Sequence, residues 1–319
     1  MNWWTGKAEI AVCILGDSNI VALGSTPGVQ TDNPNVFCYA SASGQTPYSE
    51  GNLGWYNLSN DATSRVAEFV SYSTLVPNTG FVGQLLDGNG APGMQLGNTL
   101  QEGAGADVYV YQVASPGMTS AQFSSGDCWD TVVRTAQAAL DSIPGDHAYF
   151  DVFVTNLGGN DLLSAVTDEN YFLNMALLRQ KMIAAGWWVS GITQAMILEM
   201  PRIPALADYP DVWLGHDFFL DRLNDTNGRA SSTGLTVNPD DPIPVHFVPE
   251  SNTELGRRAG ELLLAGLPKP EICGFWDDFG FTALALRTRG EIRGAMSGGL
   301  VMSGGVSSGS YTRGRVEIR

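Results

Sequence analysis

Apolar and polar positions alternate along this chain in two different periods. Short runs of β-branched and other apolar residues predict strands, and longer segments with apolar residues every three to four positions predict helices. The predicted strands are Glu9 to Leu15, Asp107 to Ala114, Asp151 to Leu157 and Val189 to Ile197. The predicted helices are Trp129 to Leu140, Tyr171 to Ala185 and Asn252 to Leu264. Because strands that alternate with helices are typical of a parallel sheet covered on both faces, the pattern predicts an α/β fold, a three-layer α/β/α sandwich.

Two regions depart from this alternation. Residues 24–90 are crowded with Gly, Asn, Ser, Thr, Pro and aromatic residues, which predicts a long surface excursion from the main domain. Residues 275–319 contain short alternating runs separated by Gly and Ser, which predicts a small β extension. We therefore expect one main domain over residues 1–270 and a Gly-rich extension over residues 271–319.

The predicted extension is basic, although the chain as a whole is acidic. Residues 287–319 hold six arginines and two glutamates, a local balance of +4, whereas the whole chain carries a formal charge of −16. A basic tail of this kind can dock on an acidic surface, either a second copy of the chain or a structural partner in a virus particle. A solvated terminal hairpin without a partner is the alternative interpretation.

Composition excludes several functional classes. The 17 Lys and Arg residues are outnumbered by 33 Asp and Glu residues, which argues against binding to nucleic-acid phosphates. No stretch approaches the roughly 20 apolar residues of a membrane-spanning helix. The first ten residues lack the basic, apolar, small-residue order of a signal peptide, so we expect neither classical secretion nor a membrane anchor. A folded protein with a substantial core is consistent with 44% hydrophobic and only 16% charged residues.

Cysteines and histidines give no sign of a metal site. The four cysteines contain no C-x-x-C pair, and the three histidines contain no H-x-x-x-H pair. We therefore expect reduced thiols, no bound metal and no cofactor.

The candidate chemistry begins with Gly16-Asp17-Ser18-Asn19, directly after the first predicted strand. A serine at a strand-to-helix turn presents its hydroxyl at the carboxyl edge of the sheet, where open α/β folds bind their ligands. The backbone N–H groups that follow can stabilise an oxyanion at the same place. Taken alone, the tetrapeptide is equally compatible with an ordinary turn that caps a helix.

Four segments, in chain order, resemble the four conserved blocks of the SGNH hydrolases, also called the GDSL esterase and lipase superfamily. The segments are Gly16 to Asn19, Ser115 to Phe123, Gly158 to Asp161 and Val245 to Phe247. The resemblance covers about residues 10–265 and implies that Ser18 is the nucleophile and His246 the general base. It also implies an oxyanion hole built from Ser18, Gly117 and Asn160. This combination is chemically coherent because a serine hydroxyl needs an adjacent base before it can attack a carbonyl.

One position departs from the family pattern. The family carries an aspartate three residues before the histidine, and Ile243 stands there in this chain. Asp240 and Asp241 are the nearest acids, and we select Asp241 as the group that orients His246 and stabilises the imidazolium. The alternative is that Asp241 begins a turn and that a backbone carbonyl or another acid orients the ring.

Four further residues are candidates for substrate binding. Asp17 adjoins the nucleophile, and His216 lies in a loop-rich segment that precedes the last block. Trp55 and Tyr56 fall in the polar excursion, where their rings could stack on a sugar. A satellite hydrophobic cluster beneath the excursion is the alternative for these two aromatic residues.

Within the superfamily, the second and last blocks are most similar to the carbohydrate O-acetylesterase branch, including sialate O-acetylesterase-like proteins. The resemblance implies a cofactor-free serine esterase that removes acetyl groups from an acetylated glycan. With no signal peptide expected, one hypothesis places the protein on a bacteriophage tail or spike that acts on host surface glycans. The alternatives are a cytoplasmic hydrolase of small esters and a non-catalytic, glycan-binding or structural virion protein that retains the fold.

Overall fold

The computed structural model describes residue 4 and residues 6–20, 33–41, 53–57, 92–114, 117–201, 226–240 and 246–266. Its strands are β1 (Glu9–Gly16), β2 (Val36–Ser41), β3 (Leu53–Asn57), β4 (Asp107–Ala114), β5 (Val152–Thr155), β6 (Gln194–Leu198) and β7 (Thr226–Ala230). Its helices are α1 (Pro92–Ala104), α2 (Ser120–Ser125), α3 (Asp127–Asp141), α4 (Gly159–Leu163), α5 (Asp168–Ala184) and α8 (Pro249–Ala265).

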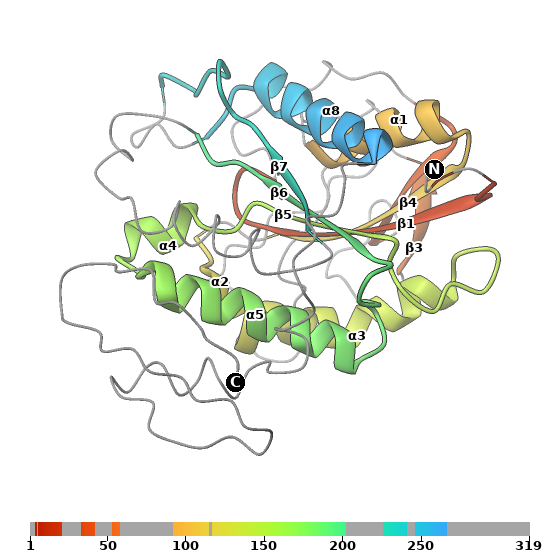
Figure 1. The fold of residues 1–319 in the computed structure, drawn as a ribbon, viewed down its shortest axis with the longest axis horizontal. Helices are drawn as coiled ribbons and strands as arrows, with labels where there is room; N and C mark the ends of the chain where they lie inside the picture. Colours follow the sequence, from red (N-terminus) through yellow and green to blue (C-terminus); the bar gives the residue numbers. More distant parts are fainter. Residues whose placement is uncertain are drawn as a thin grey trace, which may run out of the picture. The chain divides into compact units, whose positions relative to one another are not determined.

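The strands form one sheet in the order β3-β2-β4-β1-β5-β6-β7. β3 pairs antiparallel with β2, and the other neighbouring strands pair in parallel. Helices α1 and α8 cover one face of the sheet, while α3 and α5 cover the other (Figure 1). The predicted three-layer α/β/α sandwich is therefore confirmed.

The central strand β1 is covered by helices on both faces of the sheet. Residues from Ile10 to Gly16 are all buried, as expected for a parallel strand with helices on both faces. Ile10, Val12 and Ile14 belong to a core cluster that includes residues of α1 and α8. On the opposite face the core is aromatic: the rings of Tyr111 and Phe150 stack with their centroids 5.4 Å apart.

A close contact between α1 and α8 depends on a glycine. A Cβ atom added to Gly256 of α8 would lie 2.2 Å from the carbonyl oxygen of Pro92 at the start of α1. A larger residue would therefore force the two helices apart, at a cost of about 1–3 kcal/mol. This contact helps to place the amino end of α8, which directly follows the loop of His246.

The sheet is wider than the sequence pattern predicts. β2 and β3 both lie inside residues 24–90, so part of the predicted excursion extends the sheet. The predicted strand from Val189 begins later, at Gln194, because the parallel pairing of β6 with β5 starts there. Before it, the N–H groups of Ile192 and Thr193 donate to the carbonyl of Val189 in a turn.

The chain separates into two units, Met1–Ile272 and Cys273–Arg319, and every element given above belongs to the first. The β extension predicted for residues 271–319 lies outside the described residues, so the extension and its boundary stay predictions. No helix in the described part of the chain combines the length and the apolar character that crossing a membrane requires.

Candidate active site

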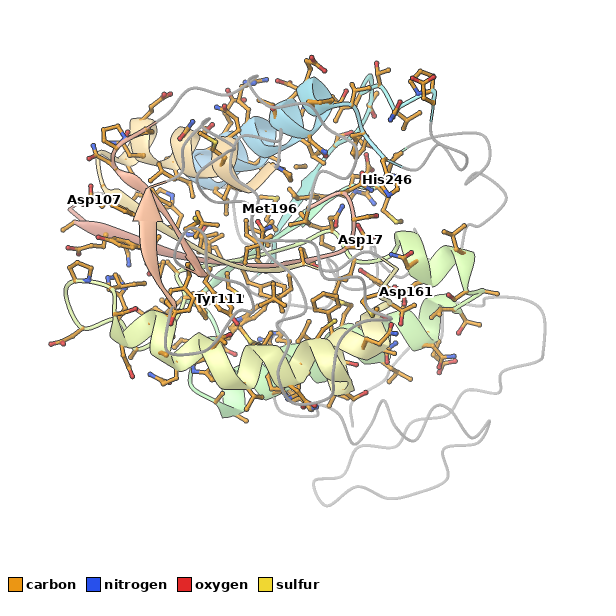
Figure 2. The ribbon with its side chains drawn as sticks, turned by 180° about the vertical axis from the view of Figure 1, so that it is seen from behind. Asp17, Asp107, Tyr111, Asp161, Met196 and His246 are labelled. Atoms are coloured by element: carbon orange, nitrogen blue, oxygen red, sulfur yellow. The ribbon has the colours of Figure 1, made fainter. Side chains whose placement is uncertain are left out.

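The candidate site is located at the carboxyl edge of the sheet. Three of the predicted blocks follow β1, β4 and β5, and β4 and β5 are the two neighbours of β1 in the sheet. Because parallel strands end at the same edge, this topology brings together segments that lie far apart in the sequence. Figure 2 shows Asp17, Asp161 and His246 close to one another at one end of the sheet, whereas Asp107, at the start of β4, lies at the other end.

Ser18 sits in a tight turn directly after β1. The backbone N–H of Ile20 donates to the carbonyl of Asp17 over 3.1 Å, and the N–H of Asn19 donates to Asp17 Oδ1, also over 3.1 Å. The turn requires a glycine at position 16, because a Cβ atom there would lie 2.1 Å from the Ile20 side chain. The sequence Gly-Asp-Ser-Asn therefore encodes a local turn that holds the serine at the edge of the sheet.

Ser18 and His246 form the pair that the sequence predicts. Ser18 Oγ lies 2.7 Å from His246 Nε2, within hydrogen-bond distance. The Ser18 side chain is largely enclosed, since the residue is 7% exposed, and His246 is half-buried. This geometry lets Nε2 accept the hydroxyl proton as the oxygen attacks a carbonyl carbon.

The peptide group that follows His246 is held by hydrogen bonds at both its carbonyl and its N–H. The N–H of Asn238 donates to the His246 carbonyl over 2.8 Å, next to an antiparallel bridge between Val237 and Phe247. The N–H of Phe247 donates to Asn19 Oδ1 over 3.0 Å. The residue after the candidate nucleophile thus binds the residue after the candidate base. The sequence predicts no role for Asn19, because this contact joins positions 228 residues apart.

The two predicted oxyanion residues follow the neighbours of β1. Gly117 lies in an exposed turn after β4 with φ of 77°, a backbone conformation that favours glycine. Asn160 is half-buried in the first turn of α4, which follows β5. Both residues are therefore at the same edge of the sheet as Ser18.

Two buried carboxyl groups adjoin these residues. Asp17 is 1% exposed, and burial together with the nearby charge of Asp161 raises the pKa of its carboxyl group to about 7. N–H groups of Asn19 and Gly159 oppose this rise in the pKa of Asp17. Burial also raises the pKa of Asp161, and its hydrogen bonds with Ser120 oppose that rise.

The structure encloses the carboxyl group of Asp17 between the turn of Ser18 and the start of α4. From there the carboxyl group supports this turn by accepting the N–H of Asn19. The contact of Asp17 with substrate stays a prediction. Sequence reasoning also missed Asp161 and Ser120, whose only signal was that each stands inside a matching block.

The remaining predicted residues are not brought together by the described structure. Trp55 and Tyr56 belong to the edge strand β3, where they are paired with Tyr39 and Cys38 of β2. Asp241 and His216 lie outside the described residues. Asp240 is exposed, and its backbone N–H donates to Asn238 Oδ1 over 3.1 Å. The acid that orients His246 therefore stays a prediction, as do the substrate contacts of Trp55, Tyr56 and His216.

Possible metal ligands are dispersed in the part of the chain that the structure describes. No group of three or more His, Cys, Asp or Glu side chains is arranged there to hold a metal ion. The described residues at this edge of the sheet include the serine and imidazole in contact and the half-buried amide of Asn160, groups of the kind that acyl transfer uses.

Comparison with solved structures finds the same fold in several proteins. A protein from Arabidopsis thaliana matches with a TM-score of 0.56 and 14% identity over 82% of this chain and 100% of its own. NanS matches with a TM-score of 0.55 and 13% identity over 86% of this chain and 99% of its own. A carbohydrate acetylesterase from Xanthomonas citri matches with a TM-score of 0.53 and 14% identity over 81% of this chain and 56% of its own. At these identities the likeness shows a shared fold.

Sequence comparison adds no family assignment. No protein-family model matches the chain, and no curated protein matches it.

Proposed function

We propose that this protein is an SGNH-type serine esterase that removes O-acetyl groups from a carbohydrate. The observation that carries the proposal is the 2.7 Å separation of Ser18 Oγ and His246 Nε2 at the carboxyl edge of a parallel sheet. Two observations support the choice of substrate: the block resemblance to carbohydrate O-acetylesterases, and the fold shared with the Xanthomonas citri carbohydrate acetylesterase. A location on a virus particle stays a prediction from the sequence.

The proposed reaction has two acyl-transfer steps. Ser18 Oγ bonds to the acetyl carbonyl carbon while its proton moves to His246 Nε2, and the carbonyl oxygen becomes an oxyanion. When the tetrahedral intermediate collapses, the bond to the sugar oxygen breaks and His246 returns the proton to that oxygen. Water then attacks the acetyl-serine while His246 takes a proton from the water molecule, the bond between the acetyl carbon and Ser18 Oγ breaks, His246 returns the proton to Oγ, and acetate leaves.

The oxyanion needs donors that are in place before the charge develops. The backbone N–H groups of Ser18 and Gly117 and the side-chain amide of Asn160 are the proposed donors. Removing one such donor typically costs about 2.7–4 kcal/mol of transition-state stabilisation. We therefore expect Asn160→Ala to retain some activity and Ser18→Ala to retain almost none.

The test is hydrolysis of p-nitrophenyl acetate and acetate release from acetylated polysaccharides, measured for wild type, Ser18→Ala and His246→Ala. We expect both variants to lose a factor of about 10^4 or more in kcat, because the serine and histidine act as one unit. The matched controls are Ser142→Ala and His147→Ala. Ser142 directly follows α3, and His147 Nε2 lies 3.9 Å from Glu9 Oε2. A folded wild type that releases no acetate from any ester would overturn the proposal.

A further inference from the structure

A single carboxylate joins the two segments that are proposed to form the oxyanion hole. Asp161 follows Asn160 in α4 and is fully buried. Its two carboxylate oxygens lie 3.1 and 2.9 Å from the backbone nitrogen of Ser120, whose N–H donates to both. Ser120 begins α2 and stands three residues after Gly117. The contact therefore bridges the loop after β4 and the loop after β5.

The side chain of Ser120 completes this connection. Its hydroxyl donates to Asp161 Oδ1 over 2.5 Å and accepts a hydrogen bond from Asn174 Nδ2 of α5 over 2.9 Å. Because Asn174 occupies an acceptor site on the hydroxyl oxygen, the proton of the hydroxyl is left to point at Asp161. Three elements, α2, α4 and α5, are thus tied together at one carboxylate.

The buried carboxylate of Asp161 depends on its hydrogen bonds. Burying a carboxylate costs free energy unless it is paired or well hydrogen-bonded, and no described lysine or arginine pairs with Asp161. The N–H and the hydroxyl of Ser120 compensate this cost, and an apolar side chain in place of Asp161 would leave both donors without their acceptor. A charged acceptor makes shorter and stronger hydrogen bonds than a neutral one, and so holds its partners more tightly in place.

We propose that Asp161 is a positioning residue that holds the turn of Gly117 at a fixed distance from Asn160, so that the oxyanion donors are set before the reaction begins. This inference rests on the proposed esterase function. Donors must lie within about 2.7–3.1 Å of the developing oxyanion, and a misplacement of about 1 Å can cost about 100-fold in rate. Because the oxyanion is absent from the bound substrate and develops only as the carbonyl is attacked, loss of the Asp161 carboxylate lowers kcat with little change in KM.

The decisive variant is Asp161→Asn, which keeps the shape of the side chain but replaces one acceptor oxygen with a donor that faces Ser120. We expect kcat for p-nitrophenyl acetate to fall roughly 10- to 100-fold while KM changes less than about threefold. The affinity for a boronic acid that forms a tetrahedral adduct with Ser18 should fall by a similar factor.

Ser120→Ala is a second and milder variant, and it tests the same proposal if Asp161→Asn does not fold. It removes the hydroxyl hydrogen bond and leaves the backbone N–H in place, so we expect a smaller loss of kcat, of about 3- to 10-fold, with KM again nearly constant.

The matched control is Asp151→Asn at the opposite edge of the sheet. Asp151 is also buried, at 4% exposed, and it also accepts a backbone N–H, from Ala11 over 3.0 Å. We expect this variant to lose stability but to keep kcat.

The outcomes separate the two proposals. Equal kcat in wild type and in both site variants, or a loss confined to KM, would overturn the positioning role while the esterase function stands. The positioning role would also be overturned if Asp151→Asn lowered kcat as much as Asp161→Asn. Wild-type hydrolysis that does not depend on Ser18 would overturn the proposed function, and the positioning role with it.

Discussion

Buried carboxylates occur at both ends of the central sheet, but the two ends treat them differently. At the amino end, Asp151 accepts the N–H of Ala11, and its Oδ1 lies 2.5 Å from Lys7 Nζ. At the carboxyl end, Asp17 and Asp161 are close enough for the charge of one to raise the pKa of the other, and no described lysine or arginine pairs with either. The amino end is therefore electrostatically compensated, whereas the candidate site is not.

Another buried carboxylate, Glu199, shows that the lack of a cationic partner is a property of the candidate site and not of the whole carboxyl edge of the sheet. Glu199 comes directly after β6, also at the carboxyl edge, and is fully buried. Its Oε1 lies 3.2 Å from Nε of Arg229, and its Oε2 accepts the N–H of Ser232 over 2.7 Å. Two strands away from β1, the same edge thus supplies a cation. Among the buried carboxyl groups of the described residues, only those of Asp17 and Asp161 have no lysine or arginine partner. Buried carboxyl groups that lack such a partner are typical of functional sites.

The largest effect that we expect from this difference is a pH dependence of stability that originates in Asp17. The unfolded chain releases this proton near pH 3.8, and the folded protein releases it near pH 7, so between these values the folded state binds one more proton. Stability therefore falls as pH rises through that window, by up to about 4 kcal/mol, since one pKa unit is worth about 1.4 kcal/mol. Asp17→Asn cannot ionise and should gain stability relative to wild type as pH rises.

Urea unfolding of wild type and Asp17→Asn at pH 4.5, 6 and 8 measures this window. A difference in unfolding free energy between the two proteins that is constant across the three values would contradict the interpretation of Asp17 as a group that folding keeps protonated.

The next effect concerns the contact between the segment of Ser18 and the segment of His246. Asn19→Ala removes the acceptor for the N–H of Phe247 and so weakens the hold on the peptide group that follows His246. We expect kcat for p-nitrophenyl acetate to fall about 10- to 100-fold, because small misalignments of a base are costly. Steady-state kinetics at constant pH provide the measurement.

Asn33→Ala is the matched control for Asn19→Ala. The Asn33 side chain also accepts a backbone N–H, from Asn35 over 3.0 Å, but it lies just before β2. Equal losses of kcat in the two variants would argue against an alignment role for Asn19.

The smallest effect is at the compensated end of the sheet. Asp151→Asn replaces a charged acceptor beside Lys7 with a neutral one, and we expect a loss of about 1–2 kcal/mol of unfolding free energy. Thermal unfolding measures the loss of stability of Asp151→Asn, and its kcat for p-nitrophenyl acetate measures whether activity is kept. A large loss of kcat without a loss of stability would reverse the roles that we assign to the two ends.

Much of the fold was predictable because its central elements are encoded locally. The predicted strand Asp107 to Ala114 coincides with β4, and the apolar run after Glu9 is β1, since both read as continuous apolar segments. β2 and β3 are short strands inside a polar, aromatic segment, where the sequence shows no clear strand pattern. β3 lies at the edge of the sheet, and a short edge strand gains its order from its neighbour and not from its own composition. β7, Thr226–Ala230, is polar for the same reason.

The sequence by itself determined the α/β fold and predicted that Ser18 and His246 act together, because apolar periodicity and the order of the blocks are both properties of the linear chain. Only the tertiary structure decided that Asn19 binds Phe247, that Asp17 is enclosed, and that Asp161 holds Ser120. Each of these depends on which loops meet at one edge of the sheet. Hydrogen bonds between residues 41 and 228 positions apart have no local signature, because their energy arises only once packing has removed water from the groups that form them.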